Sequence, residues 1–216
     1  MVPVITVAAL YIDPLGPYPK IEGVECWDEE RDARNYAGPW SVVAHPPCGP
    51  WGNLRQMRVP NRERRTQGAD CMAPAVAAVR TYGGVLEQPA GSLAFRRFGM
   101  PFPGELPDDF GGRSVAVEQV EWGHPARKAT WLYIVGRVVL ERPPFPGRAP
   151  THWVSGGRIS RTGGGVVPSG IKVCSAQQRR RTPPLFAEYL VRLARAAAAG
   201  ALSQKAVAPN ARRAPY

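Results

Sequence analysis

Cys48 is the residue whose setting points most directly to chemistry. It follows a short apolar strand, predicted over residues 40–45, and a pair of prolines, Pro46 and Pro47. Prolines fix φ and lack an N–H donor, so the strand cannot continue past His45. Ligands and reacting groups of open α/β sheets lie beyond the carboxyl ends of the strands. The Cys48 thiol is therefore presented on a stiff turn, either as a nucleophile or as an ordinary cysteine of a proline-rich loop.

Two carboxylates end other predicted strands. Glu87 ends a short strand over residues 85–87, and Asp13 follows an apolar strand over residues 4–12. A thiolate that adds to carbon 6 of a pyrimidine makes carbon 5 nucleophilic, and a carboxyl group beside the ring nitrogen and exocyclic amine stabilises the adduct. Cys48 and Glu87 on adjacent strand ends would supply both groups. Capping of neighbouring loop amides remains the alternative for Glu87, as a turn cap does for Asp13.

Apolar periodicity and turn residues predict a single α/β domain over residues 1–200, with short strands, long Pro/Gly-rich loops and three Rossmann-like layers. The predicted strands cover residues 4–12, 23–27, 40–45 and 85–87, with a hairpin over 115–120 and 130–140, and the predicted helices cover 71–82, 92–98 and 182–199, with a partly helical stretch over 28–36. We expect residues 142–170 to form an irregular basic insertion, and residues 201–216 to be a disordered tail.

The charge of the chain favours a polyanionic partner. The formal net charge is +11, and residues 151–216 carry 11 basic side chains but only 1 acidic one. Most of the basic residues are arginines, whose planar forks suit phosphate groups. DNA or a nucleotide is therefore the expected partner. A genome rich in G and C, which inflates the arginine content, is the alternative explanation.

Cysteine usage and hydropathy bear on the compartment. The four cysteines are widely spread and form no CxxC pair, which argues against a disulfide framework and a metal site. No apolar run reaches the length needed to span a bilayer, and no basic region precedes the first apolar stretch. We therefore expect a cytoplasmic protein of a bacterial or phage-infected cell, without a membrane or metal partner.

Four segments carry a family resemblance. They read AHPPC at residues 44–48, VLEQP at 85–89, QVEWGHPARKAT at 119–130 and RRRTPPLFA at 179–187. The first two resemble the Pro-Pro-Cys and Glu-Asn-Val/Pro motifs of cytosine carbon-5 DNA methyltransferases, with Gln in place of Asn. The last two are similar to the YG…RKxT segment and the R-x-TP-x-FA helix start of small phage-encoded members. The resemblance implies a methyltransferase-type sheet.

The resemblance also implies roles for single residues. Cys48 would be the nucleophile and Glu87 would contact the cytosine ring, while Arg127 and Lys128 would support the site or hold phosphate. A base flipped out of the stack is the natural geometry for duplex DNA. The candidate substrate or nucleic-acid contacts are Trp51, Arg55, Arg127, Lys128, Arg179 and Arg180. Trp51 could equally anchor its loop, and plain solvation explains the arginines at positions 179–181 equally well.

S-adenosylmethionine is the cofactor that the resemblance implies. The family has a Gly-rich loop and a helix after the first strand, but here prolines stand at positions 14, 17 and 19. The candidate cofactor contacts are Asp13, Tyr18, Asp28 and Pro46. The sequence thus leaves two functions open, a cytosine-modifying enzyme or a catalytically inactive nucleic-acid-binding module of phage origin. His45 and His124 are expected to be structural hydrogen-bonding residues.

Overall fold

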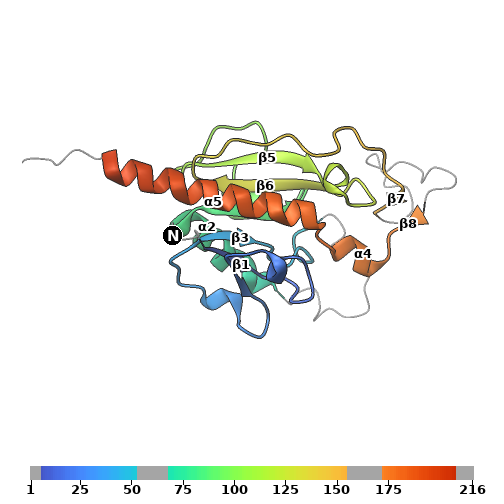
Figure 1. Ribbon diagram of the computed structural model, residues 1–216, viewed down its shortest axis with the longest axis horizontal. Helices are drawn as coiled ribbons and strands as arrows, with labels where there is room; N and C mark the ends of the chain where they lie inside the picture. Colours follow the sequence, from blue (N-terminus) through green and yellow to red (C-terminus); the bar gives the residue numbers. More distant parts are fainter. Residues whose placement is uncertain (1–5, 53–67, 155–171, 208–216) are drawn as a thin grey trace, which may run out of the picture.

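The computed structural model describes residues 6–52, 68–154 and 172–207 of the 216-residue chain. Six strands form one mixed sheet in the order β2-β1-β3-β4-β6-β5 (Figure 1). They are β1 (Val7–Leu10), β2 (Val24–Trp27), β3 (Ser41–Ala44), β4 (Gly84–Pro89), β5 (Gly112–Glu118) and β6 (Ala129–Val135). The first four strands run parallel, and β6 is antiparallel to both of its neighbours. The expected α/β class is confirmed.

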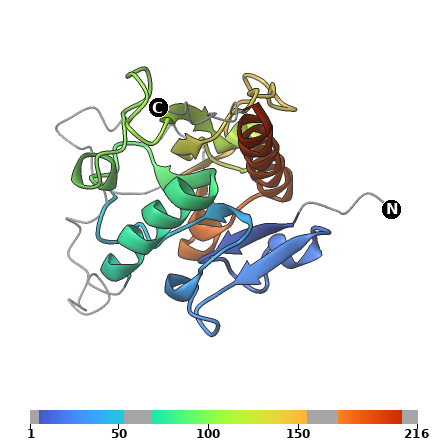
Figure 2. The same cartoon turned by 90° about the vertical axis from the view of Figure 1, so that its left-hand side faces the viewer.

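Helices cover both faces of the sheet. Figure 2 shows α2 (Met72–Tyr82) on one face and α5 (Pro184–Val207) on the other. Alternate residues of the buried strands point to opposite faces, as strand geometry requires. On β3, Val42 and Ala44 pack on the α2 side and Val43 packs on the α5 side. The sheet is therefore the middle layer of three.

The strand order places a topological switch point at β1. The chain passes from β1 to β2 on one side, while β3 lies on the other side of β1. Ligands of doubly wound sheets bind outside the carboxyl ends of the strands at such a switch point. The segments that leave β1 and β3 both begin there, and the amide of His45 donates to the carbonyl of Leu10 at 3.0 Å.

β3 and β4 approach each other closely at their amino ends. Gly84 has a φ of +119°, and a Cβ placed on it would lie 2.0 Å from the carbonyl oxygen of Val42. Glycine is the residue that permits this geometry. The close start sets the register Val42–Gly84 and Ala44–Leu86, which brings the residues after both strands to the same edge.

Most of the predicted elements are present. α2 lies where periodicity placed it, and the short helix α3 (Ala94–Arg97) lies within the predicted 92–98. β5 and β6 pair as the expected hairpin, but β6 ends at Val135 and the predicted strand over residues 130–140 is too long. The expected partly helical stretch over residues 28–36 contains only the 3-10 turn η2 (Ala33–Asn35).

The largest differences lie near the C-terminus. β7 (His152–Trp153) pairs with β8 (Lys172–Val173), so the first part of the expected irregular insertion contains a short strand. Strands of two residues leave no alternation for a pattern to detect. α4 (Ala176–Arg180) begins at a capping box of Ser175 and Gln178, a motif that was visible in the sequence.

The C-terminal helix is longer than its apolar stripe suggested. α5 runs to Val207, so residues 201–207 are helical rather than part of a disordered tail, and residues 208–216 lie outside the described ranges. The stripe fades into an alanine-rich stretch, and alanine has the highest helix propensity. In the described part of the chain, no helix combines the length and the apolar content needed to cross a membrane.

Candidate active site

The turn after β3 carries Cys48 at its tip. The amides of Trp51 and Gly52 donate to the carbonyl of Cys48 at 3.0 and 2.7 Å, which closes the turn on itself. Its base is tied to β4, because Nε2 of the buried Gln88 donates to the carbonyl of Pro46 at 2.6 Å. Cys48 as a residue is exposed, although neighbouring protein atoms surround its thiol closely enough to desolvate it. The thiol is thus held on a rigid support at the carboxyl edge of the sheet.

Glu87 lies within β4, the strand next to β3. Its side chain is 13% exposed and faces the α5 side, like Val85 two residues earlier. Nδ1 of His45 lies 3.1 Å from Oε2 of Glu87, and Nε2 of Gln119 donates to Oε1 at 3.1 Å. The same nitrogen of Gln119 donates to Oγ1 of Thr130 at 3.0 Å. Polar groups from three segments therefore converge on one carboxylate.

His45 connects this carboxylate to Tyr18. The Tyr18 hydroxyl lies 2.5 Å from Nε2 of His45. An ionised Glu87 accepts only, so Nδ1 of His45 carries a proton and donates it, while the neutral Nε2 accepts from the Tyr18 O–H. Tyr18 is only 2% exposed and belongs to the core beneath α5. Tyr18 is therefore a support of His45, and the structure does not place it where a cofactor would touch it.

The surroundings of Glu87 and Cys48 shift the pKa values of these two residues in opposite directions. Burial alone would raise the pKa of Glu87, but the hydrogen bond from His45 and the charge of Lys128 hold it below its ordinary value. Desolvation and the negative charge of Glu87 raise the pKa of the Cys48 thiol, and Lys128 and Arg180 only partly offset them. Cys48, Glu87, Lys128 and Arg180 thus form one electrostatic group, in which the resting thiol is protonated at neutral pH.

Two of the predicted cations come to this group from other segments. Lys128 has a φ of +42° in the turn between β5 and β6, and its Nζ donates to the carbonyl of Arg181 at 3.2 Å. Arg180 is exposed in the last turn of α4. Arg179 donates to the carbonyl of Cys174 at 3.2 Å, and Arg127 forms an exposed ion pair with Glu118. Lys128 and Arg180 are therefore closer to the chemistry than Arg127 and Arg179 are.

His124 fixes the turn that carries Lys128. Its Nδ1 accepts from the amide of Ala126 at 3.0 Å, and its Nε2 donates to the carbonyl of Gln178 at 3.1 Å. The carbonyl of Ala126 also lies 2.9 Å from Nδ1, and the neutral ring is the form in which Nδ1 accepts from the amide. Burial lowers the pKa of His124 accordingly. The expected structural role agrees with this geometry, which joins the turn to α4.

The acidic residues after β1 and β2 bond to their own backbone. Oδ1 of Asp13 accepts from the amide of Leu15 at 2.9 Å, and its carbonyl accepts from Gly16 at 2.8 Å. Oδ1 of Asp28 accepts from the amide of Arg31 at 3.0 Å. These are the turn-capping roles that the sequence left open as alternatives.

The other groups around the ends of β1 and β2 also bond or pack within the protein. The loop after β1 holds a three-residue 3-10 turn, η1 (Tyr18–Lys20), in place of a helix, and the amides of Lys20 and Ile21 donate within the loop. Tyr11 and Trp27 pack against the core on the α2 side. Pro46, the remaining predicted cofactor contact, is buried beneath the turn of Cys48.

Trp51 packs against the protein. Its ring meets Phe98 edge to face with the ring centroids 5.3 Å apart, and its Nε1 is buried without a hydrogen-bond partner among the described residues. Trp51 therefore anchors its loop, which is one of the two roles that the sequence left open. Arg55 lies outside the described residues.

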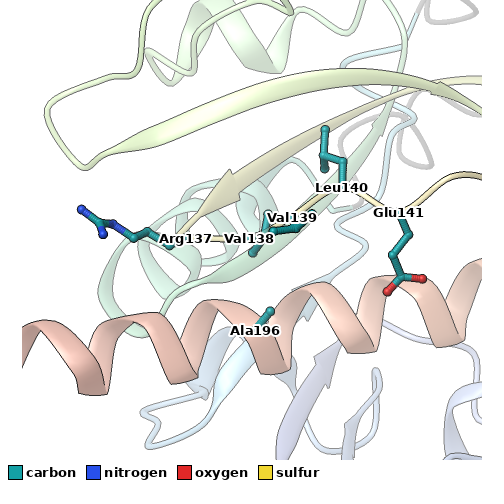
Figure 3. A pocket seen from close by; sticks show the side chains of 6 residues that line it. All are labelled: Arg137, Val138, Val139, Leu140, Glu141 and Ala196. Atoms are coloured by element: carbon teal, nitrogen blue, oxygen red, sulfur yellow. The ribbon is translucent and has the colours of Figure 1, made fainter.

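A surface cavity lies away from these groups. It has a volume of about 460 Å³ and lies between the segment after β6 and α5 (Figure 3). Its lining residues are Arg137, Val138, Val139, Leu140, Glu141 and Ala196. Because β6 is antiparallel to β4, this segment leaves the sheet at the edge opposite to Glu87. In the part of the chain that the structure describes, no three His, Cys, Asp or Glu side chains gather closely enough to hold a metal ion.

Sequence reasoning missed the residues that support the carboxylate. Gln119 and Thr130 reach Glu87 only through the register of β4 with β6, and Tyr18 reaches His45 from a loop that is distant in sequence. No protein-family model matches the chain, and no curated protein matches it significantly in sequence.

Proposed function

We propose that this protein is a cytosine-modifying enzyme that acts on DNA or a nucleotide, as the carbon-5 methyltransferase motifs suggest. The observation that carries the proposal is the position of Cys48 and Glu87 at the neighbouring carboxyl ends of β3 and β4, near enough for the negative charge of Glu87 to raise the pKa of the Cys48 thiol. A nucleophile and a ring-binding carboxylate are the two groups that attack on a pyrimidine requires.

The proposed reaction begins when the Cys48 thiol, which is protonated at rest, loses its proton to solvent water and becomes a thiolate. Its sulfur forms a bond to carbon 6 of cytosine, and the electron pair of the 5,6 double bond moves to carbon 5. The ionised Glu87 accepts a hydrogen bond from the exocyclic amine and holds the ring. Carbon 5 then takes a proton or another electrophile, and loss of the original carbon-5 proton expels the thiolate. Without any electrophile but water, the net result is exchange of the carbon-5 hydrogen with solvent.

Cations near the thiol support a phosphate-bearing substrate. Lys128 and Arg180 both interact electrostatically with Cys48 and lower the pKa of its thiol. Their positive charges would attract the phosphates that flank a target base. In duplex DNA the target base would have to leave the stack to reach a thiol on a turn.

The loop after β1 does not fit the carboxylate end of S-adenosylmethionine. Such a group binds at free N–H groups of a helix N-terminus. Here the amides of Leu15, Gly16, Lys20 and Ile21 already donate within the loop, and the prolines of the loop carry none. The proposal therefore ends at the activated pyrimidine, and we derive no methyl transfer.

A catalytically silent nucleic-acid-binding module is the second candidate. The observation that favours it is the commitment of both His45 nitrogens, to Tyr18 and Glu87, which leaves His45 unable to accept the Cys48 proton. The raised pKa of Cys48 points the same way. Such a module would keep the cations and would not depend on the thiol.

Mass spectrometry of DNA bases separates the two candidates. DNA would be taken from cells that express the wild-type chain, the Cys48→Ala variant or the Cys71→Ala variant, which removes another partly exposed thiol. The enzyme predicts a changed cytosine with the wild type and Cys71→Ala, and none with Cys48→Ala. If all three DNAs have the same bases while the proteins bind DNA, the silent module is the better description.

A further inference from the structure

His45 takes no part in the proposed reaction, yet its ring is mostly buried and hydrogen bonded at both nitrogens. Its side chain is 12% exposed, and it makes one hydrogen bond at each ring nitrogen. The two partners come from η1 and β4, while His45 itself follows β3. The ionised Glu87 only accepts, so Nδ1 of His45 points its proton at Glu87, and Nε2 of the neutral ring is left to accept from the buried Tyr18 hydroxyl.

We propose that His45, fixed by Tyr18, is a positioning residue that keeps Glu87 an ionised hydrogen-bond acceptor and thereby selects pyrimidines that carry an exocyclic amine. An ionised carboxylate accepts from the amine of cytosine and repels the carbonyl oxygen that uracil and thymine carry at the same position. A protonated carboxyl could donate to that carbonyl and would lose the distinction. The selection of pyrimidines that carry an amine rests on the proposed function. The effect of His45 on the ionisation of Glu87 does not.

The groups that face Glu87 from each packed element are consistent with this role. His45 donates from the segment after β3, and Gln119 donates from η5. Lys128 contributes positive charge from the turn before β6, whereas Cys48 is repelled by the carboxylate. Among these groups His45 is the one that combines a direct hydrogen bond to Glu87 with a fixed tautomer.

Carbon-13 NMR of the Glu87 carboxyl tests the ionisation directly, with no substrate present. Titration from pH 7 to pH 3 would be compared between the wild type, His45→Phe and His45→Gln. Phe fills the space without a donor, and Gln retains one. We expect the proton affinity of Glu87 to rise about tenfold in His45→Phe and to stay near the wild-type value in His45→Gln. Equal titration of Glu87 in all three proteins would overturn the proposal.

Carbon-5 hydrogen exchange in D₂O tests the selection on matched deoxycytidine and deoxyuridine oligonucleotides. We expect the wild type to favour deoxycytidine and His45→Phe to lose about tenfold of that preference, with His45→Gln close to the wild type. An unchanged preference in His45→Phe overturns the selection. Absence of exchange in the wild type refutes the proposed function and the selection together, while the titration still decides the role of His45.

His45→Phe changes a mostly buried side chain and could affect folding, so the wild type supplies an independent readout. Nitrogen-15 NMR of the His45 ring distinguishes the two neutral tautomers. The proposal requires the proton on Nδ1 at pH 8, with Nε2 bare. A proton found on Nε2 would mean that Glu87 receives no donor from His45, and would overturn the proposal without any substitution.

Discussion

At the ends of β3 and β4, polar side chains reach from one strand to the next, whereas at the ends of β1 and β2 they bond to their own backbone. Glu87 has partners after β3 and in η5, and Gln88 holds the turn of Cys48. Asp13 and Asp28 each cap a local turn. Both halves belong to the same edge of one sheet. The comparison indicates that any reaction of the proposed kind would take place at the β3–β4 half.

The largest expected effect is a difference in activity between a substitution at the ends of β3 and β4 and one at the ends of β1 and β2. Glu87→Gln removes the ring-binding charge and should lower the rate of carbon-5 exchange on cytosine at least about 100-fold. Asp13→Asn keeps its turn and should stay within about twofold of the wild type. Mass spectrometry of deuterated cytosine measures both rates. Equal losses in the two variants would break the comparison.

The next effect concerns stability. Gln88→Met keeps the volume of the side chain but leaves the buried Pro46 carbonyl and the Ser92 hydroxyl without their Gln88 partner. The expected loss is about 1–3 kcal/mol in the free energy of unfolding. Asp28→Ala removes an acceptor from a local turn and should cost about 1 kcal/mol or less. Urea unfolding of both variants checks the ranking, and an equal or reversed cost would contradict it.

The smallest effect is a pH dependence at the turn that carries Lys128. Burial lowers the pKa of His124 from its ordinary value of 6.5, so the unfolded chain binds the proton more tightly than the folded chain does. The stability that the neutral ring contributes is complete above pH 6.5 and is lost as the pH falls below it. Thermal unfolding between pH 7.5 and 5.5 should show this loss in the wild type.

His124→Gln provides the variant for this prediction, and His152→Gln provides the control. His124→Gln should be less stable at pH 7.5 and should lose less stability on acidification. His152 is only partly buried on β7, bonds to Thr151 and contributes only a minor part of the His124 shift, so its replacement should leave most of the pH dependence in place. The prediction is refuted if His152→Gln, rather than His124→Gln, flattens the curve.

Local pattern was enough to predict the elements that frame the candidate site. The apolar run before Pro46 identified β3, and the helical stripe before Gly83 identified α2. The turn of Cys48 followed from the two prolines. What could not be predicted is the network around Glu87, because it depends on strand order and register. Gln119 meets Glu87 only once β6 has been inserted between β4 and β5.

At the ends of β1 and β2, where the sequence predicted cofactor contacts, the difficulty was to choose between two local roles. Asp13 and Asp28 stand where a ligand-binding acid would stand, and each also begins a short polar turn. Sequence could not decide between these roles, because an Asx turn and a ligand contact use the same oxygen atoms. Tyr18 illustrates the same difficulty, since a tyrosine between prolines reads as a surface residue until η1 folds it beneath α5.

Deuterium exchange at carbon 5 of cytosine tests the central claim most directly, since it needs no methyl donor. The wild-type chain and the Cys48→Ala variant would be incubated in D₂O with an oligonucleotide that contains cytosine, and the cytosine mass would be measured. The account predicts a gain of one deuterium with the wild type and none with Cys48→Ala. No gain with the wild type, or an equal gain with both, would contradict it.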